Sequence, residues 1–402
     1  MVSNTLRPNI WLNYGNRLIC NFCFVLVSIF IFDISYVWAQ STYLNPVFRN
    51  YKSHDLSLVK GKDGYIYAFG SCNVPRNKNE ELIYYGVNIF RSKDLIDWNF
   101  YKLAFKQNKV DKIKQSHASA LAQGQYFLKY GKSVISYPIW APDVIEYNGK
   151  YLMFVSLRNS FKDSKIVVFE TKNLSEDFVF KRIVVSCDKK DKDAYVLSEE
   201  IIDPFPIVDD GNLYLVYGSF ARNGNGKLIE ARKNIGVYIV RLDNKSYKKI
   251  DNPIYLTDYY EGCSIQKHAG KYYLFGTNGN WKNHTYKISY AVSNTLTGPY
   301  LNHKGKSIAD TVNIHLGKVI LQTINSNLKY NGFGCMSNPI IDKNGRFFVL
   351  VNGHDLSISP IVETSSVKER YGFLIELRWN KENDPYFNLK QIEENKIYNP
   401  KL

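Results

Sequence analysis

The chain is poor in the features that mark several protein classes. Only six of its 402 residues are cysteines, and the four beyond the N-terminal segment are scattered. No spacing among these four resembles a zinc site, and they are too few for a disulfide-rich domain of this size. We therefore expect buried free thiols at the four positions: Cys72, Cys187, Cys263 and Cys335.

The sequence also lacks a helical hydrophobic repeat, so we expect little helix. An apolar run at residues 18–32 follows Arg7 and Arg17, but its length of about fifteen residues is short of the ~20 that span a bilayer. Val37-Trp38-Ala39 fits the small-residue rule before a cleavage point. We therefore predict a signal peptide at residues 1–39 of a secreted or periplasmic protein. An uncleaved membrane anchor is the alternative.

The formal net charge of +15 does not come from a basic stripe. Lysines are spread over expected loops, as at residues 106–114 and 189–192, where they mix with Asp. A nucleic-acid partner is therefore not expected. Lysine-rich solvated loops explain the charge, with attraction to acidic pectin or to an anionic cell surface as the alternative.

A repeated motif is what the sequence does contain. Five times, a glycine after a turn-forming or small residue leads into an aromatic-rich strand that is apolar on both faces, which predicts five hairpins. The five copies begin at Asp63-Gly64, Asn148-Gly149, Asp210-Gly211, Ala269-Gly270 and Asn344-Gly345.

Units of this kind must stack, and closing them into a ring leaves no exposed sheet edge. We therefore predict an all-β fold, a single five-bladed β-propeller over residues 45–386, with residues 387–402 as a C-terminal tail. A β-sandwich is the alternative.

The incoming strand of each hairpin carries a notable side chain six to ten residues before the glycine. Four are carboxylates and the fifth is a thiol: Asp55, Asp143, Asp203, Glu261 and Cys335. In a radial arrangement these side chains converge on the axis, where they would form an active site. The alternative is that they cap turns.

The segments around these residues resemble glycoside hydrolase family 43. They are His54-Asp55-Leu56-Ser57, Trp140-Ala141-Pro142-Asp143, Ile202-Asp203-Pro204, Tyr260-Glu261-Gly262 and Gly332-Phe333-Gly334-Cys335. The resemblance implies a five-bladed propeller that cuts arabinose- or xylose-containing plant polysaccharide. Arabinan is the leading substrate hypothesis, and a β-xylosidase and a non-catalytic glycan-binding propeller are the alternatives.

The family pattern also implies roles for three carboxylates. Asp55 would be the general base and Glu261 the general acid, with a raised pKa, of a hydrolysis that inverts the anomeric centre. Asp203 would raise the pKa of Glu261 by its nearby charge.

Four further residues are candidates for substrate binding. Trp140 could stack on a sugar or pack in the core, and Asp143 could bind substrate or be structural. Trp281 could line the same cleft, and a bend at the strand end could bring His54 to the substrate.

Two departures from the family pattern concern the axis. Leu56 stands where the family usually has Pro, so one backbone restraint is lost. Cys335 stands where many members have a His that faces an axial ion, often calcium. Because calcium prefers oxygen ligands, we expect no required cofactor, and we name only His354 as an alternative ligand. We expect a polysaccharide or oligosaccharide partner, no membrane contact after cleavage, and a monomer.

Overall fold

A computed structural model describes residues 45–48, 51, 53–72, 86–105, 125–130, 133–160, 162–220, 236–258, 260–323, 329–357, 370–387, 392, 400 and 402. Every named element in these ranges is a β-strand. They contain no helix that is long and apolar enough to cross a bilayer. The predicted signal peptide lies outside the described residues.

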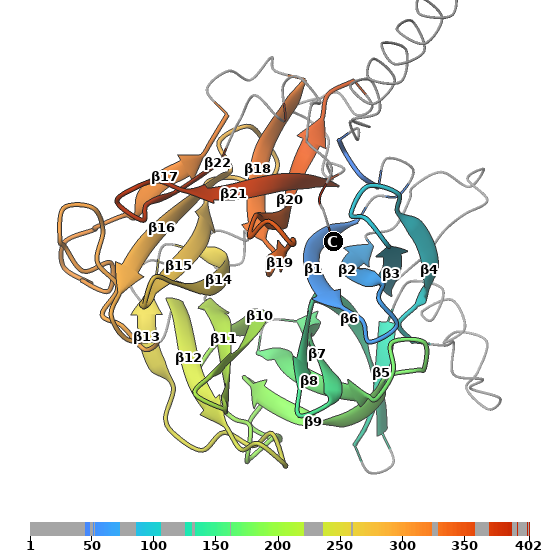
Figure 1. Ribbon diagram of the computed structural model, residues 1–402. Coiled ribbons are helices and arrows are strands. Elements are labelled where there is room, and N and C mark those ends of the chain that lie inside the picture. Colours follow the sequence, from blue (N-terminus) through green and yellow to red (C-terminus); the bar gives the residue numbers. More distant parts are fainter. Residues whose placement is uncertain are drawn as a thin grey trace, which may run out of the picture.

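The strands form five antiparallel sheets around one axis, which confirms the predicted five-bladed propeller (Figure 1). Blade 1 contains β1 (His54–Lys60), β2 (Ile66–Cys72), β3 (Gly86–Ser92) and β4 (Asn99–Leu103). Blade 2 contains β5 (Gln125–Tyr130), β6 (Ser133–Tyr147), β7 (Lys150–Ser160), β8 (Asp163–Thr171) and β9 (Val179–Ser186). Blade 3 contains β10 (Glu200–Asp209), β11 (Asn212–Phe220), β12 (Gly236–Leu242) and β13 (Ile254–Thr257).

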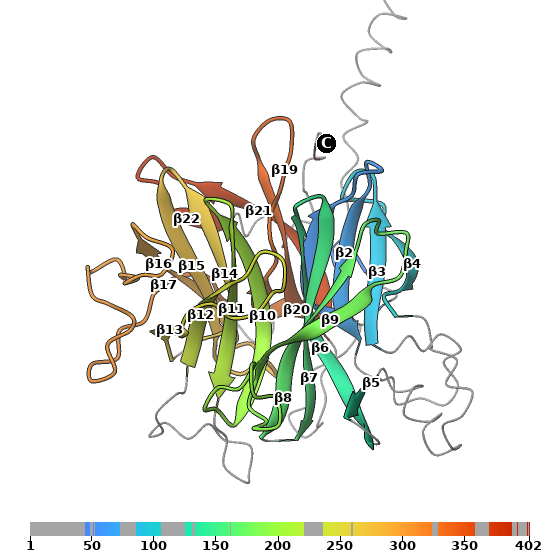
Figure 2. The same cartoon turned by 90° about the horizontal axis from the view of Figure 1, so that it is seen from below.

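Blade 4 contains β14 (Glu261–His268), β15 (Lys271–Asn278), β16 (Lys287–Ser293) and β17 (Lys318–Leu321). Blade 5 contains β18 (Tyr330–Met336), β19 (Ile340–Ile341), β20 (Phe347–Asp355), β21 (Tyr371–Trp379) and β22 (Pro385–Phe387). The innermost strands are β1, β6, β10, β14 and β18, and from each of these strands the blade continues outward in chain order (Figures 1 and 2). β5 was not predicted from the sequence, and it pairs with the first half of β6.

The core consists of five apolar clusters, and each cluster fills the interface between two neighbouring blades. This explains why the central strands are apolar on both faces, because each sheet is covered on both sides. Ile392, in the predicted tail, is 2% exposed and belongs to the cluster between blades 4 and 5. At least this part of the tail is therefore packed onto the propeller.

Blades 1 and 5 close the ring through the first described residues. The Asn45 side chain exchanges two hydrogen bonds with the main chain of Leu374 in β21, and the N–H of Val47 donates to the carbonyl of Gly372. Because Asn45 is 1% exposed, these hydrogen bonds are shielded from competing water.

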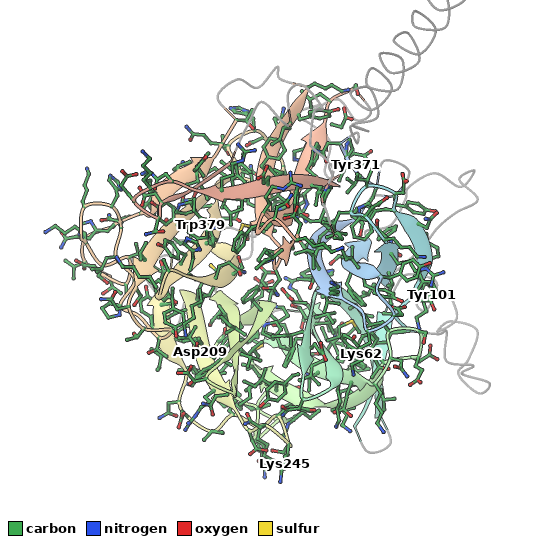
Figure 3. All side chains as sticks on the ribbon, in the orientation of Figure 1. Lys62, Tyr101, Asp209, Lys245, Tyr371 and Trp379 are labelled. Atoms are coloured by element: carbon green, nitrogen blue, oxygen red, sulfur yellow. The ribbon has the colours of Figure 1, made fainter. Side chains whose placement is uncertain are left out.

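Polar and stacking contacts also join other blades, and three of the residues are labelled in Figure 3. The ammonium of Lys62 in the β1–β2 turn donates to the carbonyl of Gly149 in blade 2. Asp209 accepts a hydrogen bond from Tyr272 of blade 4 at 2.8 Å. Trp379 stacks on His268 across blades 5 and 4, with ring centres 3.9 Å apart.

The predicted hairpin glycines all have a positive φ. In blades 2, 3 and 4 the residue before the glycine is also left-handed, which is the geometry of a two-residue type I′ turn. The turns of blades 1 and 5 have a positive φ only at Gly64 and Gly345, and their strands are separated by longer connections.

Candidate active site

Each innermost strand has an irregularity in its pairing with the next strand, close to the axis. At this β-bulge one residue of every blade has a φ between 46° and 56°, the left-handed region. The five bulge residues are Asp55, Ala141, Asp203, Gly262 and Cys335. A bulge turns one side chain out of the regular alternation of a strand, so it directs these positions into the axial region.

This register corrects the expectation that four carboxylates occupy nearly equivalent positions. Only Asp55 and Asp203 are bulge residues. Glu261 precedes the bulge residue of blade 4, and Asp143 follows that of blade 2 by two positions. The hairpin glycines could not reveal these offsets, because a bulge inserts a residue between the turn and the site.

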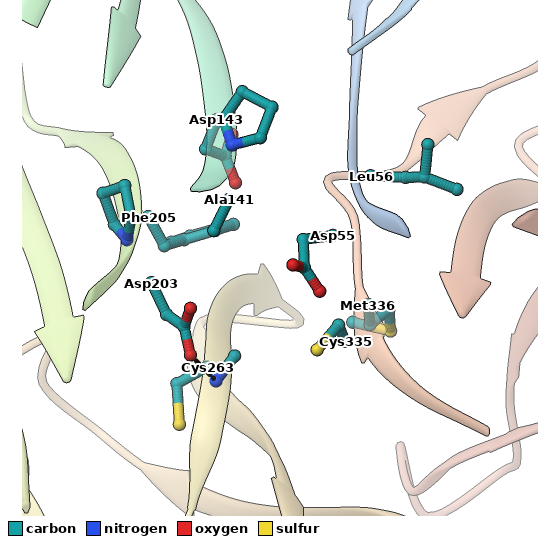
Figure 4. Close-up of a pocket in the computed structure, with 12 residues that line it drawn as sticks. Asp55, Leu56, Ala141, Asp143, Asp203, Phe205, Cys263, Cys335 and Met336 are labelled. Atoms are coloured by element: carbon teal, nitrogen blue, oxygen red, sulfur yellow. Dashed lines mark hydrogen bonds between the residues drawn. The ribbon is translucent and has the colours of Figure 1, made fainter. Parts of the chain in front are cut away.

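The bulges surround a small axial cavity of about 40 Å³. All five innermost strands contribute to its lining, including the bulge residues of every blade. Asp55 and Asp203 reach towards it from opposite sides, and Cys335 lies beside Asp55 (Figure 4).

Asp55 lies in a cluster of hydrogen-bond donors. One carboxylate oxygen is 3.0 Å from the amide nitrogen of Asn352 and 3.3 Å from the guanidinium of Arg370. The other oxygen is 2.8 Å from Nδ1 of His54. Burial opposes ionisation, but Arg370 and His54 outweigh it and hold the pKa of Asp55 well below its usual value. This carboxylate remains an anion and can accept a proton.

Asp203 occupies the same bulge position in its blade, but its pKa is shifted in the opposite direction. Burial and the negative charges of Asp55 and Glu261 raise the pKa of Asp203 well above its usual value. Its carboxyl accepts a hydrogen bond from the N–H of Gly262 at 3.1 Å, which opposes the rise only in part. The negative charge of Glu261 is thus one of the causes of the raised pKa of Asp203.

Glu261 is held by a tyrosine from its own blade. The hydroxyl of Tyr286 donates to Oε1 of Glu261 at 2.8 Å and lies 3.3 Å from Sγ of Cys335. Burial raises the pKa of the Tyr286 hydroxyl and of the Cys335 thiol, so both groups keep their protons.

Asp143 lies deeper along its strand and is 8% exposed. Its Oδ1 accepts a hydrogen bond from the hydroxyl of Ser57 at 2.9 Å. Burial raises the pKa of Asp143 to about 8, despite this hydrogen bond. Asp143 therefore contributes a neutral carboxyl to the cavity lining at neutral pH.

The remaining sequence candidates occupy different environments. Trp140 is partly buried, and the guanidinium of Arg158 lies 5.1 Å from its ring centre. The guanidinium of Arg370 lies 5.2 Å from the ring centre of Trp281. Because Arg370 also contacts Asp55, only this guanidinium separates the Trp281 ring from the Asp55 carboxylate. His54 is 6% exposed and contacts Asp55 directly.

His354 does not line the axial cavity, and it is not in a surface loop. It is 2% exposed in β20, and its Nε2 donates to the carbonyl of Trp281 at 3.0 Å. This hydrogen bond supports the segment that carries the Trp281 ring.

Three residues of the site were missed in the sequence: Tyr286, Asn352 and Arg370. Arg370 is the most consequential, because it places a cation next to Asp55. No local pattern marks these residues. Tyr286 is 25 positions from Glu261, and the other two are 297 and 315 positions from Asp55. Asn352 directly follows the apolar strand of the fifth repeat. The glycine after it, Gly353, is the only nearby feature that sets this position apart in the sequence.

The lining does not fit the calcium ion that the resemblance implied. A calcium site needs six to eight oxygen ligands, whereas here Asp55 is already engaged by three side chains and Cys335 presents a protonated thiol. The described residues include no group of three or more His, Cys, Asp or Glu side chains arranged to hold a metal. Cys187, Cys263 and Cys335 are free, as expected, although Cys335 is partly exposed rather than buried.

Known proteins resemble this chain in both sequence and fold. It is 26% identical over 273 residues to an extracellular endo-alpha-(1->5)-L-arabinanase of Bacillus subtilis, covering 64% of this chain and 70% of that protein. It is 22% identical over 327 residues to an extracellular exo-alpha-(1->5)-L-arabinofuranosidase of Cellvibrio japonicus, covering 77% and 82%.

Among solved structures, the alpha-L-arabinanase of Cellvibrio cellulosa in complex with arabinohexaose has a TM-score of 0.60 at 19% identity. The match covers 86% of this chain and 98% of that one. Residues 43–318 match the family described as Glycosyl hydrolases family 43. Because this match spans more than half of the sequence, the chain belongs to glycosyl hydrolases family 43 and is a glycoside hydrolase of an inverting family.

Proposed function

We propose that the protein hydrolyses arabinan or arabinan oligosaccharides, with Asp55 as general base and Glu261 as general acid. The observation that carries the assignment of roles is the contrast at the axis. Asp55 is stabilised as an anion, whereas Glu261 is next to Asp203, whose pKa is raised. An inverting glycosidase needs such a pair, one carboxylate ready to take a proton and one carboxyl ready to give it.

In this mechanism Asp55 removes a proton from the attacking water on one face of the sugar. Glu261 protonates the leaving oxygen on the other face, and the hydroxyl of Tyr286 keeps its carboxyl oriented. Asp203 acts on Glu261 as a pKa modulator, because the negative charge of either carboxyl opposes the ionisation of the other. Trp281 and Trp140 would contact the sugar.

Arabinan is supported over xylan by the arabinan-cleaving activities in the names of both sequence relatives. Both are also called extracellular, which agrees with the predicted signal peptide. We accordingly propose that this protein is secreted or periplasmic.

The test is a comparison of leaving groups in wild type and Glu261→Gln. Assays would use linear arabinan, nitrophenyl arabinofuranoside and nitrophenyl xyloside. We expect Glu261→Gln to lose about 10²–10⁴-fold on arabinan and far less on the activated nitrophenyl arabinofuranoside, which needs little protonation. Glu146→Gln, at an exposed position of β6, is the control.

Equal losses on both arabinose substrates would remove Glu261 from the acid role. Turnover of the xyloside alone would favour the β-xylosidase alternative. Glycan binding without turnover of any substrate would favour the non-catalytic alternative.

A further inference from the structure

The main chain around the axis has a hydrogen-bond pattern that repeats from blade to blade. In every blade the N–H of the bulge residue donates to a side-chain oxygen of the preceding blade. In four cases the acceptor lies on the second strand of its blade, next to the innermost strand. There it pairs with the residue just before the bulge residue of that same blade. The four acceptors are Ser71, Ser156, Thr277 and Asn352, at 2.7–3.0 Å from the N–H nitrogens of Ala141, Asp203, Cys335 and Asp55.

Three of the five equivalent positions carry Ser or Thr, whose hydroxyl only has to accept the hydrogen bond from the N–H. The other two positions carry no hydroxyl. Asn352 provides an amide instead. The equivalent position in blade 3 is Gly218, which pairs with Ile202 and has no side chain to accept anything.

The amide at position 352 makes two hydrogen bonds to one residue. Its Oδ1 accepts from the Asp55 N–H, and its Nδ2 donates to Oδ1 of Asp55, both at 3.0 Å. A hydroxyl has one oxygen for both functions, whereas the planar amide offers an acceptor and a donor on separate atoms. Asn352 therefore fixes the main chain and the carboxylate of Asp55 together.

The missing side chain at Gly218 leaves the N–H of Gly262 without the usual partner. Asp203 takes its place, with its Oδ2 3.1 Å from that nitrogen. Because Gly262 directly follows Glu261, the hydrogen bond ties the Asp203 carboxyl to the backbone next to Glu261. A serine at position 218 would offer a hydroxyl that competes for the same N–H.

We propose that Asn352 and Gly218 are positioning residues of the hydrolytic site. Asn352 holds the carboxylate of Asp55 in place, and the absence of a side chain at position 218 turns the carboxyl of Asp203 towards the backbone of Glu261 and Gly262. The link to catalysis rests on the proposed function, whereas the two hydrogen-bond roles can be measured without turnover.

Other charged and titratable groups also face the two carboxyls, and the test must separate their effects. Asp55 faces His54, Arg370, Cys335 and Asp203. Asp203 faces Asp55, Glu261 and Glu200, together with the thiols of Cys263 and Cys335. All of these groups remain in the variants below, so a change reports the altered hydrogen bond.

The first variant is Asn352→Ser, which restores the hydroxyl found at the equivalent positions. The Asp55 N–H keeps an acceptor, but the carboxylate loses its amide donor. A hydrogen bond to a charged group contributes about 1.5–3 kcal/mol, so the pKa of Asp55 should rise by about one to two units. We expect the acid limb of the pH–rate profile on nitrophenyl arabinofuranoside to move up by that amount. The ¹³C-carboxyl NMR titration of Asp55 should move equally without substrate.

Ser71→Ala is the matched control, because it removes the corresponding hydrogen bond in a blade whose bulge residue is Ala141. It should lower stability and leave both titrations where they are. Unchanged titrations in Asn352→Ser, or equal shifts in Ser71→Ala, would overturn the role of Asn352.

The second pair of variants is Gly218→Ser and Gly218→Ala. Gly218 has the φ of an ordinary strand residue, so both substitutions are compatible with the backbone conformation. Only serine supplies a competing hydroxyl. Loss of the Gly262 donor should move the NMR titration of Asp203 to higher pH and lower kcat about tenfold relative to Gly218→Ala, with KM nearly unchanged.

Identical behaviour of the serine and alanine variants would overturn the role of Gly218. If neither variant folds, the proposal stands or falls on Asn352→Ser. If the wild type hydrolyses none of the glycosides, the proposed function fails, and the two NMR titrations still decide the hydrogen-bond roles.

Discussion

Blades 1 and 3 place the same residue type in the same backbone conformation, and yet the pKa values of the two carboxyls are shifted in opposite directions. Asp55 and Asp203 are both bulge residues, with φ values of 50° and 56°. Asp55 has a cation, a histidine and an amide within hydrogen-bond distance. Asp203 has one main-chain donor and three carboxylate neighbours, Asp55, Glu261 and Glu200. The blade therefore supplies the position, and the groups around each carboxyl determine the direction of its pKa shift.

The largest expected effect follows from the ionised state of Asp55. Asp55→Asn removes the proposed base, so kcat should fall by about 10²–10⁴-fold. Asp203→Asn should keep more activity, because it changes only the environment of Glu261. Without the competing carboxyl, Glu261 ionises more readily, so the alkaline limb of the pH–rate profile should move to lower pH. Equal losses of kcat in Asp55→Asn and Asp203→Asn, with both limbs of the pH–rate profile unchanged, would contradict the different roles of these two carboxyls.

A second prediction concerns the cation that separates the two environments. Arg370→Met removes the positive charge next to Asp55, so the pKa of Asp55 should rise. The acid limb of the pH–rate profile should then move to higher pH by about one unit or more. Arg378→Met, in the strand that directly follows Arg370 but paired with Glu376, is the control and should not move the limb. An unchanged acid limb in Arg370→Met would assign the depressed pKa to His54 and Asn352.

A third prediction uses Asp143, which is buried at the axis next to a neutral hydroxyl. Its pKa of about 8 lies above the ordinary value, so the folded state holds a proton that the unfolded state releases. Stability should therefore fall as the pH rises from about 4 to 8. Asp143→Asn keeps an acceptor for Ser57 and removes this titration. Its stability relative to wild type should improve over that range by a few kcal/mol, as measured by urea unfolding at each pH.

The control is Glu146→Gln, at an exposed site, whose stability relative to wild type is measured at the same pH values. A pH-independent difference between wild type and Asp143→Asn would contradict the raised pKa.

The smallest expected effect concerns metal removal. We predict that prolonged chelation changes activity by less than about twofold, since the axial groups do not form a calcium site. A large loss that calcium restores would mean that a cation lies between Asp55 and Asp203 and controls both protonation states. That ion would then be the main cause of the difference between the pKa values of Asp55 and Asp203.

Much of the fold could be predicted because its signals are local. The glycine turns specify φ angles within two residues, and strands apolar on both faces indicate sheets covered on both sides. The carboxylates Asp55, Asp203 and Glu261 were found because each lies on the strand just before such a turn. β5 and the packed Ile392 were missed, since both depend on contacts that no short pattern records.

The sequence by itself therefore determined the number of blades, their order and the residues on the innermost strands. Tertiary structure alone decided which of these residues is a bulge residue and what surrounds it. Asp55 and Asn352 are separated by 297 positions, and Arg370 is 315 positions from Asp55. A pKa depends on burial and on charges a few ångströms away. Those distances exist only after the fifth blade has closed against the first.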